Sequence, residues 1–221
     1  MARRQLLIFG IVFLLAGGSA ASRSRRKDAG SRAAAPFDYY LLTLSWAPDF
    51  CAAPGGVKDP RECGAGRHIR FVVHGLWPQS NNGRGPENCG SASPVSKSIV
   101  ALMLHYIPTE SLIQHEWSTH GSCTGLTADA YFALVRQARD GVQIPAVFTS
   151  LTQQTSESAA QVETQFAMAN PAYPKTAFRA TCTNGMLQEA RLCFDKNLTA
   201  QACTASAGEC TAAAMTILPP K

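Results

Sequence analysis

Eight cysteines lie between Cys51 and Cys210, and they restrict the folds open to this chain more than any other feature. The N-terminus has the pattern of an export signal, with Arg3 and Arg4 before the apolar run Leu6–Leu15. In an oxidising compartment, an even number of cysteines predicts a disulfide framework, here of four bridges. Because no Cys-x-x-Cys pair occurs, the spacing argues against a zinc ribbon or a thioredoxin-type redox pair.

The N-terminal pattern also predicts how the chain is divided. We expect residues 1–21 to be a signal peptide, since small residues follow the apolar run, and residues 22–36 to be a flexible basic leader. Residues 37–221 would form a single domain. The apolar run is shorter than the ~20 residues that a membrane-spanning helix needs, so an uncleaved anchor is the minor alternative. The prediction is a secreted or periplasmic protein without stable membrane association.

The net charge of +5 is misleading about possible partners. Seven of the 20 Lys and Arg residues precede Ala33, and from there on 13 basic residues accompany 14 acidic ones. An extended nucleic-acid interface usually has a basic footprint, and this part of the chain lacks one. Any nucleic acid that this part of the chain binds should therefore be held briefly and locally. Nothing in the sequence indicates an oligomer, and we expect a monomer.

Four segments have the composition and alternation of β-strands: 37–46, 69–73, 178–183 and 186–194. The first has apolar residues on both faces, which indicates a central strand covered on both sides. The last two flank Asn184-Gly185, a strong hairpin signal. Helical periodicity and caps predict helices over 95–106, 110–120, 127–140 and 156–169. Together these elements indicate an α+β fold, with a mixed or antiparallel central sheet, helices packed on one side of it, and disulfide staples.

Two short segments, Phe71–Pro78 and His115–Cys123, concentrate the residues that can do chemistry. They hold three of the five histidines, one flanking glutamate and two of the three tryptophans. On a helix, residues i+1 and i+5 lie about 100° and 140° around from residue i. The side chains of His115, Glu116 and His120 should therefore share one face.

The third histidine, His74, is expected at the end of the 69–73 strand, where Gly75 and Pro78 would turn the chain. Two imidazoles with pKa values near neutrality can move protons in opposite directions in one step. A phosphodiester beside a ribose 2′-hydroxyl supplies its own nucleophile, so the reaction needs no serine, cysteine or metal. The pattern therefore predicts RNA cleavage by a pair of histidines.

Three other interpretations are open to these residues. A His-Glu pair near a second histidine invites zinc, but zinc-protease helices place ligands at i and i+4, whereas His115 and His120 are i and i+5. The histidines could be satisfied inside a core, which is a better interpretation for a lone histidine than for three beside a glutamate. A nucleophilic serine, Ser45 or Ser122, is disfavoured because neither lies in Gly-x-Ser-x-Gly.

The two segments closely resemble the active-site segments of a known family, the ribonuclease T2 family. The resemblance covers Phe-Val-Val-His-Gly-Leu-Trp-Pro at 71–78 and His-Glu-Trp-Ser-Thr-His-Gly-Ser-Cys at 115–123, and it extends to 39–46. It implies an α+β fold and a metal-independent endoribonuclease that cleaves single-stranded RNA, not DNA, with low base specificity. The implied reaction is transesterification to 2′,3′-cyclic phosphates, followed by hydrolysis to 3′-phosphates. It requires no metal and no other cofactor.

The resemblance also implies roles for the catalytic residues. His120 would be the base toward the 2′-hydroxyl and His74 the acid toward the 5′-oxygen. Glu116 would polarise the phosphoryl group or orient His120. The family commonly has a lysine just before the second histidine of the second segment, and here that position is Thr119. The loss of this positive charge affects the expected rate.

Substrate-binding roles follow from the same resemblance. His115 would bind phosphate, Trp77 and Gln79 would line one base site, and Leu112 would lie near the other. Stacking of a base on an aromatic ring tolerates every base, which agrees with low base specificity.

The resemblance implies a Cys89–Cys123 disulfide, as in family members, and beside it we expect Cys51–Cys63 and a nested Cys182–Cys210 and Cys193–Cys203. Spacing alone does not decide this pairing. An alternative function remains: a catalytically weak or inactive relative that acts as a secreted module binding RNA or protein.

Overall fold

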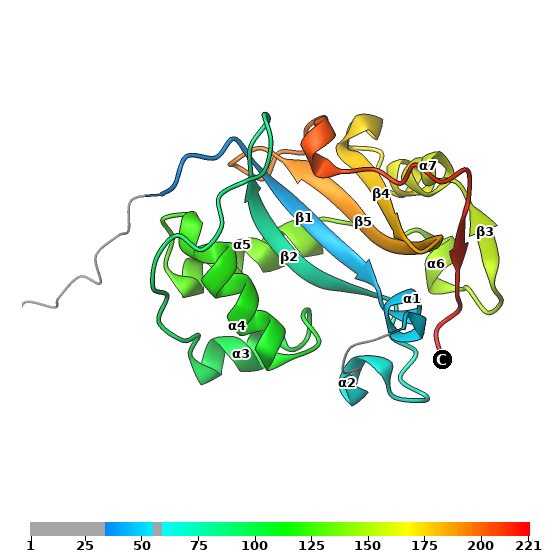
Figure 1. The fold of residues 1–221 in the computed structure, drawn as a ribbon, viewed down its shortest axis with the longest axis horizontal. Coiled ribbons are helices and arrows are strands. Elements are labelled where there is room, and N and C mark those ends of the chain that lie inside the picture. Colours follow the sequence, from blue (N-terminus) through cyan, green and yellow to red (C-terminus); the bar gives the residue numbers. More distant parts are fainter. Residues whose placement is uncertain (1–33, 55–58) are drawn as a thin grey trace, which may run out of the picture. The chain divides into compact units, whose positions relative to one another are not determined.

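The computed structural model describes residues 34–54 and 59–221 (Figure 1). The predicted signal peptide and the predicted leader up to residue 33 lie outside the described residues. The N–H of Ala35 donates to the carbonyl of Cys123 at 3.0 Å, so the contacts of the folded unit begin before Phe37. None of the helices in the described ranges is long and apolar enough to cross a membrane.

A six-stranded sheet is the centre of the fold, and its order is β2-β1-β5-β6-β3, with β4 paired to β5. All pairs are antiparallel except a single parallel bridge between β5 and β6, which confirms the mixed sheet. The predicted hairpin is present, and Asn184 and Gly185 take the positive φ angles of 53° and 74° that its two-residue turn requires. The strands are β1 Tyr39–Trp46, β2 Phe71–Gln79, β3 Thr155–Glu157, β4 Phe178–Thr183, β5 Met186–Phe194 and β6 Met215–Ile217.

The four predicted helices are present, and three further short ones accompany them among the described residues. The bounds are α1 Ala47–Ala52, α2 Pro60–Cys63, α3 Lys97–Met103, α4 Glu110–Thr119, α5 Ala128–Asp140, α6 Ala146–Thr149 and α7 Ala159–Ala169. The predicted caps Thr109 and Thr127 accept hydrogen bonds from the first turns of α4 and α5. Residues 156–157, predicted as helix, instead belong to β3, and the capping box of Ser158 starts α7.

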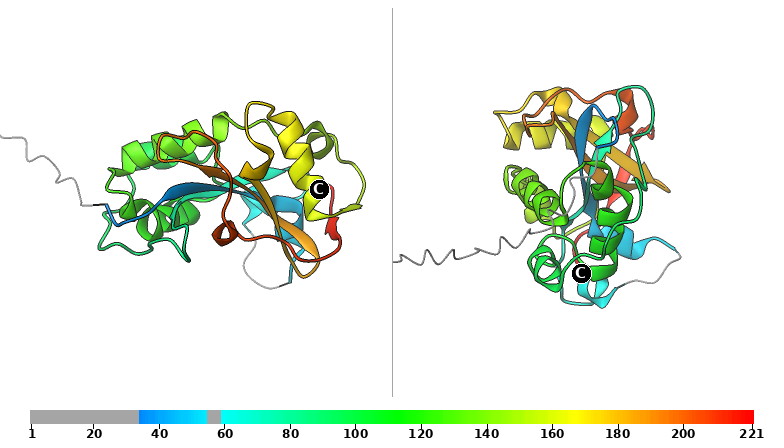
Figure 2. Two further views of the ribbon diagram at one scale, coloured as in Figure 1. Left: turned by 90° about the horizontal axis from the view of Figure 1, so that it is seen from above. Right: turned by 90° about the vertical axis from the view of Figure 1, so that its left-hand side faces the viewer.

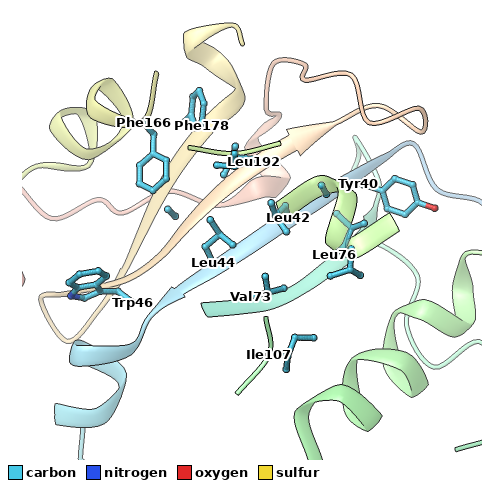
Figure 3. Packing of buried hydrophobic residues seen from close by; sticks show 14 of the residues in the cluster. Tyr40, Leu42, Leu44, Trp46, Val73, Leu76, Ile107, Phe166, Phe178 and Leu192 are labelled. Atoms are coloured by element: carbon cyan, nitrogen blue, oxygen red, sulfur yellow. The ribbon is translucent and has the colours of Figure 1, made fainter. Parts of the chain in front are cut away.

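One face of the sheet carries the main hydrophobic core. Tyr40, Leu42 and Leu44 of β1 are at most 4% exposed and belong to one cluster with Phe132 of α5 and Phe166 of α7 (Figure 3). Both helices lie over this face of the sheet (Figure 2). The prediction of a helical layer on one side of the sheet is thus confirmed.

The other face of β1 is also covered, as the sequence predicts for a central strand. Tyr39 and Leu41 form a second, smaller cluster with Cys193 and Ala207. Further along this face, the register places Thr43 and Ser45 between residues of β2 and β5. The candidate catalytic residues lie here, on the second face.

Strand β2 differs from its prediction. The sequence predicts a turn at Gly75 and Pro78, but the strand continues to Gln79 and pairs with β1 along its whole length. Proline is tolerated because β2 is an edge strand, where no ladder partner needs the missing N–H. The turn prediction was wrong because it used the local preferences of Gly and Pro without the pairing that overrides them.

A β-bulge interrupts the pairing of β2 at His74. Thr43 pairs with Gly75 and Leu44 pairs with Val73, so His74 is an extra residue with no partner of its own. Bulges change the direction in which a side chain points and occur often beside active sites. His74 is therefore within the strand and not at its end.

Four disulfides staple the fold, and their pairing is the expected one. They join Cys51–Cys63, Cys89–Cys123, Cys182–Cys210 and Cys193–Cys203. The second attaches the segment after α4 to the loop after β2, and so joins the two segments that carry the histidines.

Candidate active site

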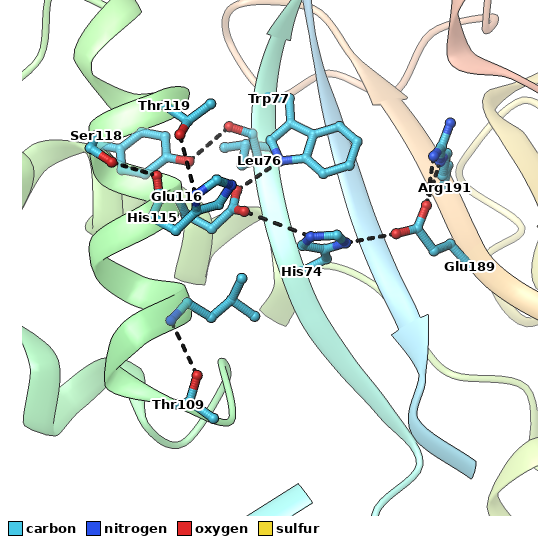
Figure 4. Close-up of polar contacts among 12 residues, drawn as sticks. His74, Leu76, Trp77, Thr109, His115, Glu116, Ser118, Thr119, Glu189 and Arg191 are labelled. Atoms are coloured by element: carbon cyan, nitrogen blue, oxygen red, sulfur yellow. Dashed lines mark hydrogen bonds and ion pairs between the residues drawn. The ribbon is translucent and has the colours of Figure 1, made fainter. Parts of the chain in front are cut away.

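The side chain of His74 lies between two carboxyl groups on the second face of the sheet (Figure 4). Its Nδ1 is 2.7 Å from Oε1 of Glu189 on β5, and its Nε2 is 3.8 Å from Oε1 of Glu116 on α4. The side chain is 33% exposed, whereas both carboxylates are almost completely buried. One nitrogen is thus held by the protein while the other faces α4.

Glu189 is itself held by a second charged residue of β5. Arg191 donates two hydrogen bonds to Oε2 of Glu189, from Nε at 2.8 Å and from an Nη at 2.6 Å. The two residues alternate with Ala190 along the strand, so they lie on the same face. The result is a continuous chain of charged groups from Arg191 through Glu189 to His74.

The C-terminal end of α4 brings Glu116 and His120 to the same place. The helix ends at Thr119, and His120 is the C-cap residue with φ −112° and ψ −50°. One ligand-type atom from each of His115, Glu116 and His120 lies within 4.8 Å of the other two. The predicted convergence of these three side chains is therefore present, and the departure from helical geometry at His120 contributes to it.

Trp77 lies between the two histidines. Its ring centroid is 5.1 Å from that of His74, edge to face, and 5.1 Å from that of His120, stacked. Its Nε1–H donates to Oε2 of Glu116 at 2.7 Å. Gly75 makes this contact possible, since a Cβ there would overlap both Glu116 and Trp77.

The surroundings shift the pKa values of the two histidines in opposite directions. Burial alone would lower the pKa of His74, but the hydrogen bond and charge of Glu189, with the charge of Glu116, raise it above 6.5. Burial lowers the pKa of His120 to about 4, and the charges of His115 and His74 add to this effect. At neutral pH, His120 is therefore a neutral base and His74 retains protonated character.

The two glutamates next to His74 also differ. Burial raises the pKa of Glu116 to about 7, although His74 and Trp77 oppose the shift. Burial acts in the same direction on Glu189, but His74 and Arg191 outweigh it and lower its pKa. Glu189 is therefore an ionised acceptor, whereas Glu116 exchanges its proton near neutral pH.

A comparison with known protein families shows which family has these segments. The model of the Ribonuclease T2 family matches residues 37–203. The chain belongs to the ribonuclease T2 family.

Known relatives agree with this assignment. The chain is 38% identical over 133 residues to a probable ribonuclease of Haemophilus influenzae, which covers 55% of this chain and 49% of that protein. It is 34% identical over 112 residues to a ribonuclease of Aeromonas hydrophila, which covers 51% of this chain and 49% of that protein. The chain thus spans about half the length of these curated relatives.

Solved structures share the fold at lower identity. RNase NT in complex with 5′-AMP matches with a TM-score of 0.66 and 20% identity, over 84% of this chain and 100% of that one. Ribonuclease MC1 from the seeds of bitter gourd matches with a TM-score of 0.62 and 21% identity, over 82% and 100%. These matches confirm a ribonuclease T2-like α+β fold.

This member of the ribonuclease T2 family has a cavity beside His74. Its volume is about 390 Å³, and its lining includes Leu112, Val72 and Leu187 together with Ser45. The acidic residues Asp49, Glu62 and Glu189 border the same cavity, so it combines apolar walls with polar groups, as small-molecule sites do. Leu112 of α4 thus borders the same cavity as His74.

The other predicted binding residues lie in different surroundings. His115 is exposed, and its Nδ1 is 3.5 Å from Oγ1 of Thr119, the residue at the family's lysine position. Gln79 uses its side-chain oxygen to accept from the N–H of Gly85 at 3.1 Å, so it holds the loop after β2. The structure therefore gives Gln79 a positioning contact that the sequence does not predict.

Sequence reasoning missed Glu189 and Arg191. The available signal was a pair of opposite charges, two residues apart, in the largely apolar strand Met186–Phe194. Two charges on one face of a mostly buried strand need partners. Only the sheet register shows that His74 is one of them.

The cluster of His115, Glu116 and His120 has the donor types of a zinc site. Oε2 of Glu116 is already engaged by Trp77, while Oε1 has no hydrogen-bond partner. Two imidazoles and one carboxylate oxygen are therefore the donors that such an ion would use.

Proposed function

We propose that this protein is a metal-independent endoribonuclease that cleaves single-stranded RNA with low base specificity. The observation that carries the proposal is the convergence of two imidazoles with opposite pKa shifts on one buried carboxyl. Membership of the ribonuclease T2 family supports the same activity. The similar fold of RNase NT, which was solved with 5′-AMP, supports a nucleotide ligand.

In the first step, neutral His120 takes the proton of the ribose 2′-hydroxyl, and the 2′-oxygen attacks phosphorus. His74 gives its proton to the 5′-oxygen as the bond between phosphorus and that oxygen breaks. The products are a 2′,3′-cyclic phosphate and a free 5′-hydroxyl. In the second step the roles reverse, and water opens the cyclic phosphate to a 3′-phosphate. This division of roles follows from the lower pKa of His120.

Glu116 steadies the phosphoryl group in this proposal. Its Oε1 is buried, has no hydrogen-bond partner and lies 3.8 Å from His74 Nε2, where the reacting phosphate would approach. With a pKa of about 7, the carboxyl can be protonated and donate a hydrogen bond to a phosphoryl oxygen. His115, which is exposed at the same end of α4, would add a contact to phosphate.

Bases on either side of the reacting phosphate would use different surfaces. The cavity beside His74, with Leu112 in its wall, suits the base that follows the cleaved bond. Trp77 and Gln79 would border the other base, although both already contact protein groups. Apolar contact and stacking discriminate weakly among bases, which supports low base specificity.

The proposed setting is a secreted or periplasmic one, in which the protein acts as a monomer. Four disulfides within the described residues support an oxidising compartment. Because DNA lacks the 2′-hydroxyl nucleophile, it would not be cleaved.

The test is a cleavage assay with purified mature protein, single-stranded RNA and EDTA, with single-stranded DNA as the control. We expect cleavage of RNA only, with 2′,3′-cyclic phosphates appearing before 3′-phosphates in the product analysis. Absence of cleavage between about pH 4 and 8, where histidines titrate, would favour the inactive binding module. Loss of activity in EDTA that zinc restores would favour the metal site.

A further inference from the structure

Glu189 is a buried carboxylate that touches the candidate acid but lies in neither of the two histidine segments. We propose that Glu189, held in place by Arg191, is a positioning residue that makes His74 the general acid of the reaction. The inference rests on the proposed ribonuclease function and adds a residue to it. It predicts that one carboxylate determines the division of labour between the two histidines.

The hydrogen bonds around Glu189 determine which nitrogen of His74 carries a proton. Both hydrogen bonds from Arg191 go to Oε2, so Oε1 is left for Nδ1 of His74 at 2.7 Å. An ionised carboxylate can only accept, and Nδ1 must therefore be protonated. The remaining nitrogen, Nε2, is the one that faces Glu116 and the proposed phosphate position.

Arg191 prevents Glu189 from moving away. Besides its two bonds to Glu189, it donates to the carbonyl of Ala207 at 2.6 Å, and its guanidinium carbon lies 5.6 Å from the ring centroid of Trp77. A carboxylate fixed by two bonds on one oxygen presents the other oxygen in one direction. His74 is thus oriented by a rigid partner, as a catalytic base or acid requires.

The charged groups around His74 come from each element that packs against it. Glu189 and Arg191 belong to β5, while Glu116 and His120 come from α4 and its C-cap. The β1 residues beneath it, Thr43 and Ser45, have no charge, and Asp49 and Glu62 border the same cavity. Of these groups, Glu189 is the one in direct hydrogen-bond contact with the ring, so its charge acts at the shortest distance.

The role is consistent with the proton balance of the reaction. In the cyclising step His74 begins as an imidazolium, loses the Nε2 proton to the 5′-oxygen and keeps the Nδ1 proton on Glu189. In the hydrolytic step Nε2 takes a proton from water, and the imidazolium forms again beside the carboxylate. Glu189 stays ionised throughout and favours the charged form of the ring in both steps.

The deciding variant is Glu189→Gln. Arg191 offers only donors, so the amide oxygen must face Arg191 and the amide NH₂ must face Nδ1 of His74. An NH₂ group in that place favours a ring without the Nδ1 proton and disfavours the imidazolium. Glu157→Gln is the matched control, because Glu157 is a buried glutamate of the same sheet, on β3, outside the site.

The first readout is the pH dependence of kcat/KM. In the wild type, activity should rise with pH through the pKa of His120 at about 4, because His120 must lose its proton. It should fall as pH rises through the raised pKa of His74 and through the pKa of Glu116 at about 7, because both groups act in their protonated forms. Glu189→Gln should move only the alkaline limb, to lower pH by about one unit or more, and Glu157→Gln should move neither.

The second readout is the dependence on the leaving group. A dinucleotide needs an acid for its 5′-oxygen, whereas a nucleoside 3′-(4-nitrophenyl phosphate) has a leaving group that needs none. We expect Glu189→Gln to lower kcat on the dinucleotide by roughly 10- to 100-fold, which is part of the 10²- to 10⁴-fold that a general acid contributes, and on the aryl ester by less than about threefold. Equal losses on both substrates, or an unmoved alkaline limb, would overturn the proposal.

A third measurement uses the wild-type protein, so it requires neither a folded Glu189→Gln variant nor ribonuclease activity. In the wild type, the imidazole NMR signals of His74 should show a protonated Nδ1 at all pH values between about 5 and 8, and a ring pKa above that of His120. A neutral ring with its proton on Nε2 would refute the role of Glu189. If the wild type cleaves no RNA, the proposed function fails, while this measurement still tests the pairing.

Discussion

His74 and His120 carry the same imidazole in opposite surroundings. His74 lies on a strand between two carboxyl groups and is partly exposed. His120 lies at the end of a helix, is buried, and has its ring stacked on Trp77 without a hydrogen bond to another described residue. A paired carboxylate favours the charged ring, whereas burial without one favours the neutral ring.

This difference explains how one residue type can supply both an acid and a base. Two histidines in equal surroundings would gain and lose their protons over the same pH range, so neither protonation state would belong to one particular ring. Here the environments separate the two pKa values, so that a pH range exists in which one ring is charged and the other is neutral. In the proposed mechanism, the division of labour between the two histidines therefore comes from the surroundings of the rings.

The two histidines also differ in how they are attached. His74 is mounted on a strand that pairs with β1 along its whole length, at a bulge. His120 follows the last turn of α4, three residues before Cys123 of the Cys89–Cys123 disulfide. His74 is thus held by sheet pairing, whereas His120 lies between the end of a helix and a disulfide.

Removing either ring should have the largest effect. We expect His74→Ala and His120→Ala each to lower kcat on a dinucleotide by about 10²- to 10⁴-fold, the usual contribution of a general acid or base. On the aryl ester, His74→Ala should recover most of its activity, because the leaving group needs no proton, whereas His120→Ala should not. Steady-state kinetics on the two substrates measure this contrast.

His115→Ala is the control for His120→Ala, because it also removes an imidazole from α4. It should mainly raise KM, since His115 is exposed and would contact phosphate. Normal cleavage by His120→Ala, or recovery of both catalytic variants on the aryl ester, would show that the two histidines do not divide the roles as proposed.

Removing the staple should affect stability and His120 together. Cys89→Ser with Cys123→Ser opens a loop with a sequence separation of 34, which in the chain-entropy model lowers the free energy of unfolding by about 3 to 4 kcal/mol. Urea unfolding would measure this loss, and kcat below the transition should fall as well. The control is Cys51→Ser with Cys63→Ser, which opens a loop with a sequence separation of only 12. This double variant should lose less stability and keep its kcat. Equal kcat in both double variants would mean that the staple does not position His120.

The smallest expected effect concerns Thr119. Replacing it with lysine places a cation beside His115 and His120, where it can offset phosphoryl charge, and should raise kcat/KM by about two- to tenfold. The gain should shrink with added salt, as expected for a partly exposed charge. Thr119→Met, which has length without charge, is the control. The same gain for methionine would show that packing, and not charge, limits the rate.

Local signals predicted most of the sheet and the four main helices. The hairpin around Asn184-Gly185 and the helices begun by Thr109 and Thr127 were identified because turns and caps depend on neighbouring residues. The short strands β3 and β6 were missed because three residues are too few to show the alternation of apolar and polar residues that indicates a strand. The continuation of β2 through Gly75 was missed because it depends on the partner strand.

The candidate site divides in the same way. His115, Glu116 and His120 could be placed together from the sequence because they share one helix and its end. The pairing of His74 with Glu189 could not, since it joins residues that are 115 positions apart through the register of two strands on β1. A strand shifted by one residue would point Glu189 to the other face, and no local property of the chain reveals that shift.

The sequence by itself determined the family, the two histidine segments and the chemistry that they can perform. The tertiary structure decided which histidine is charged. Proton affinity depends on burial and on the nearest charges, and those are set by groups that approach from distant parts of the chain. An imidazole has no fixed role until the fold supplies its neighbours.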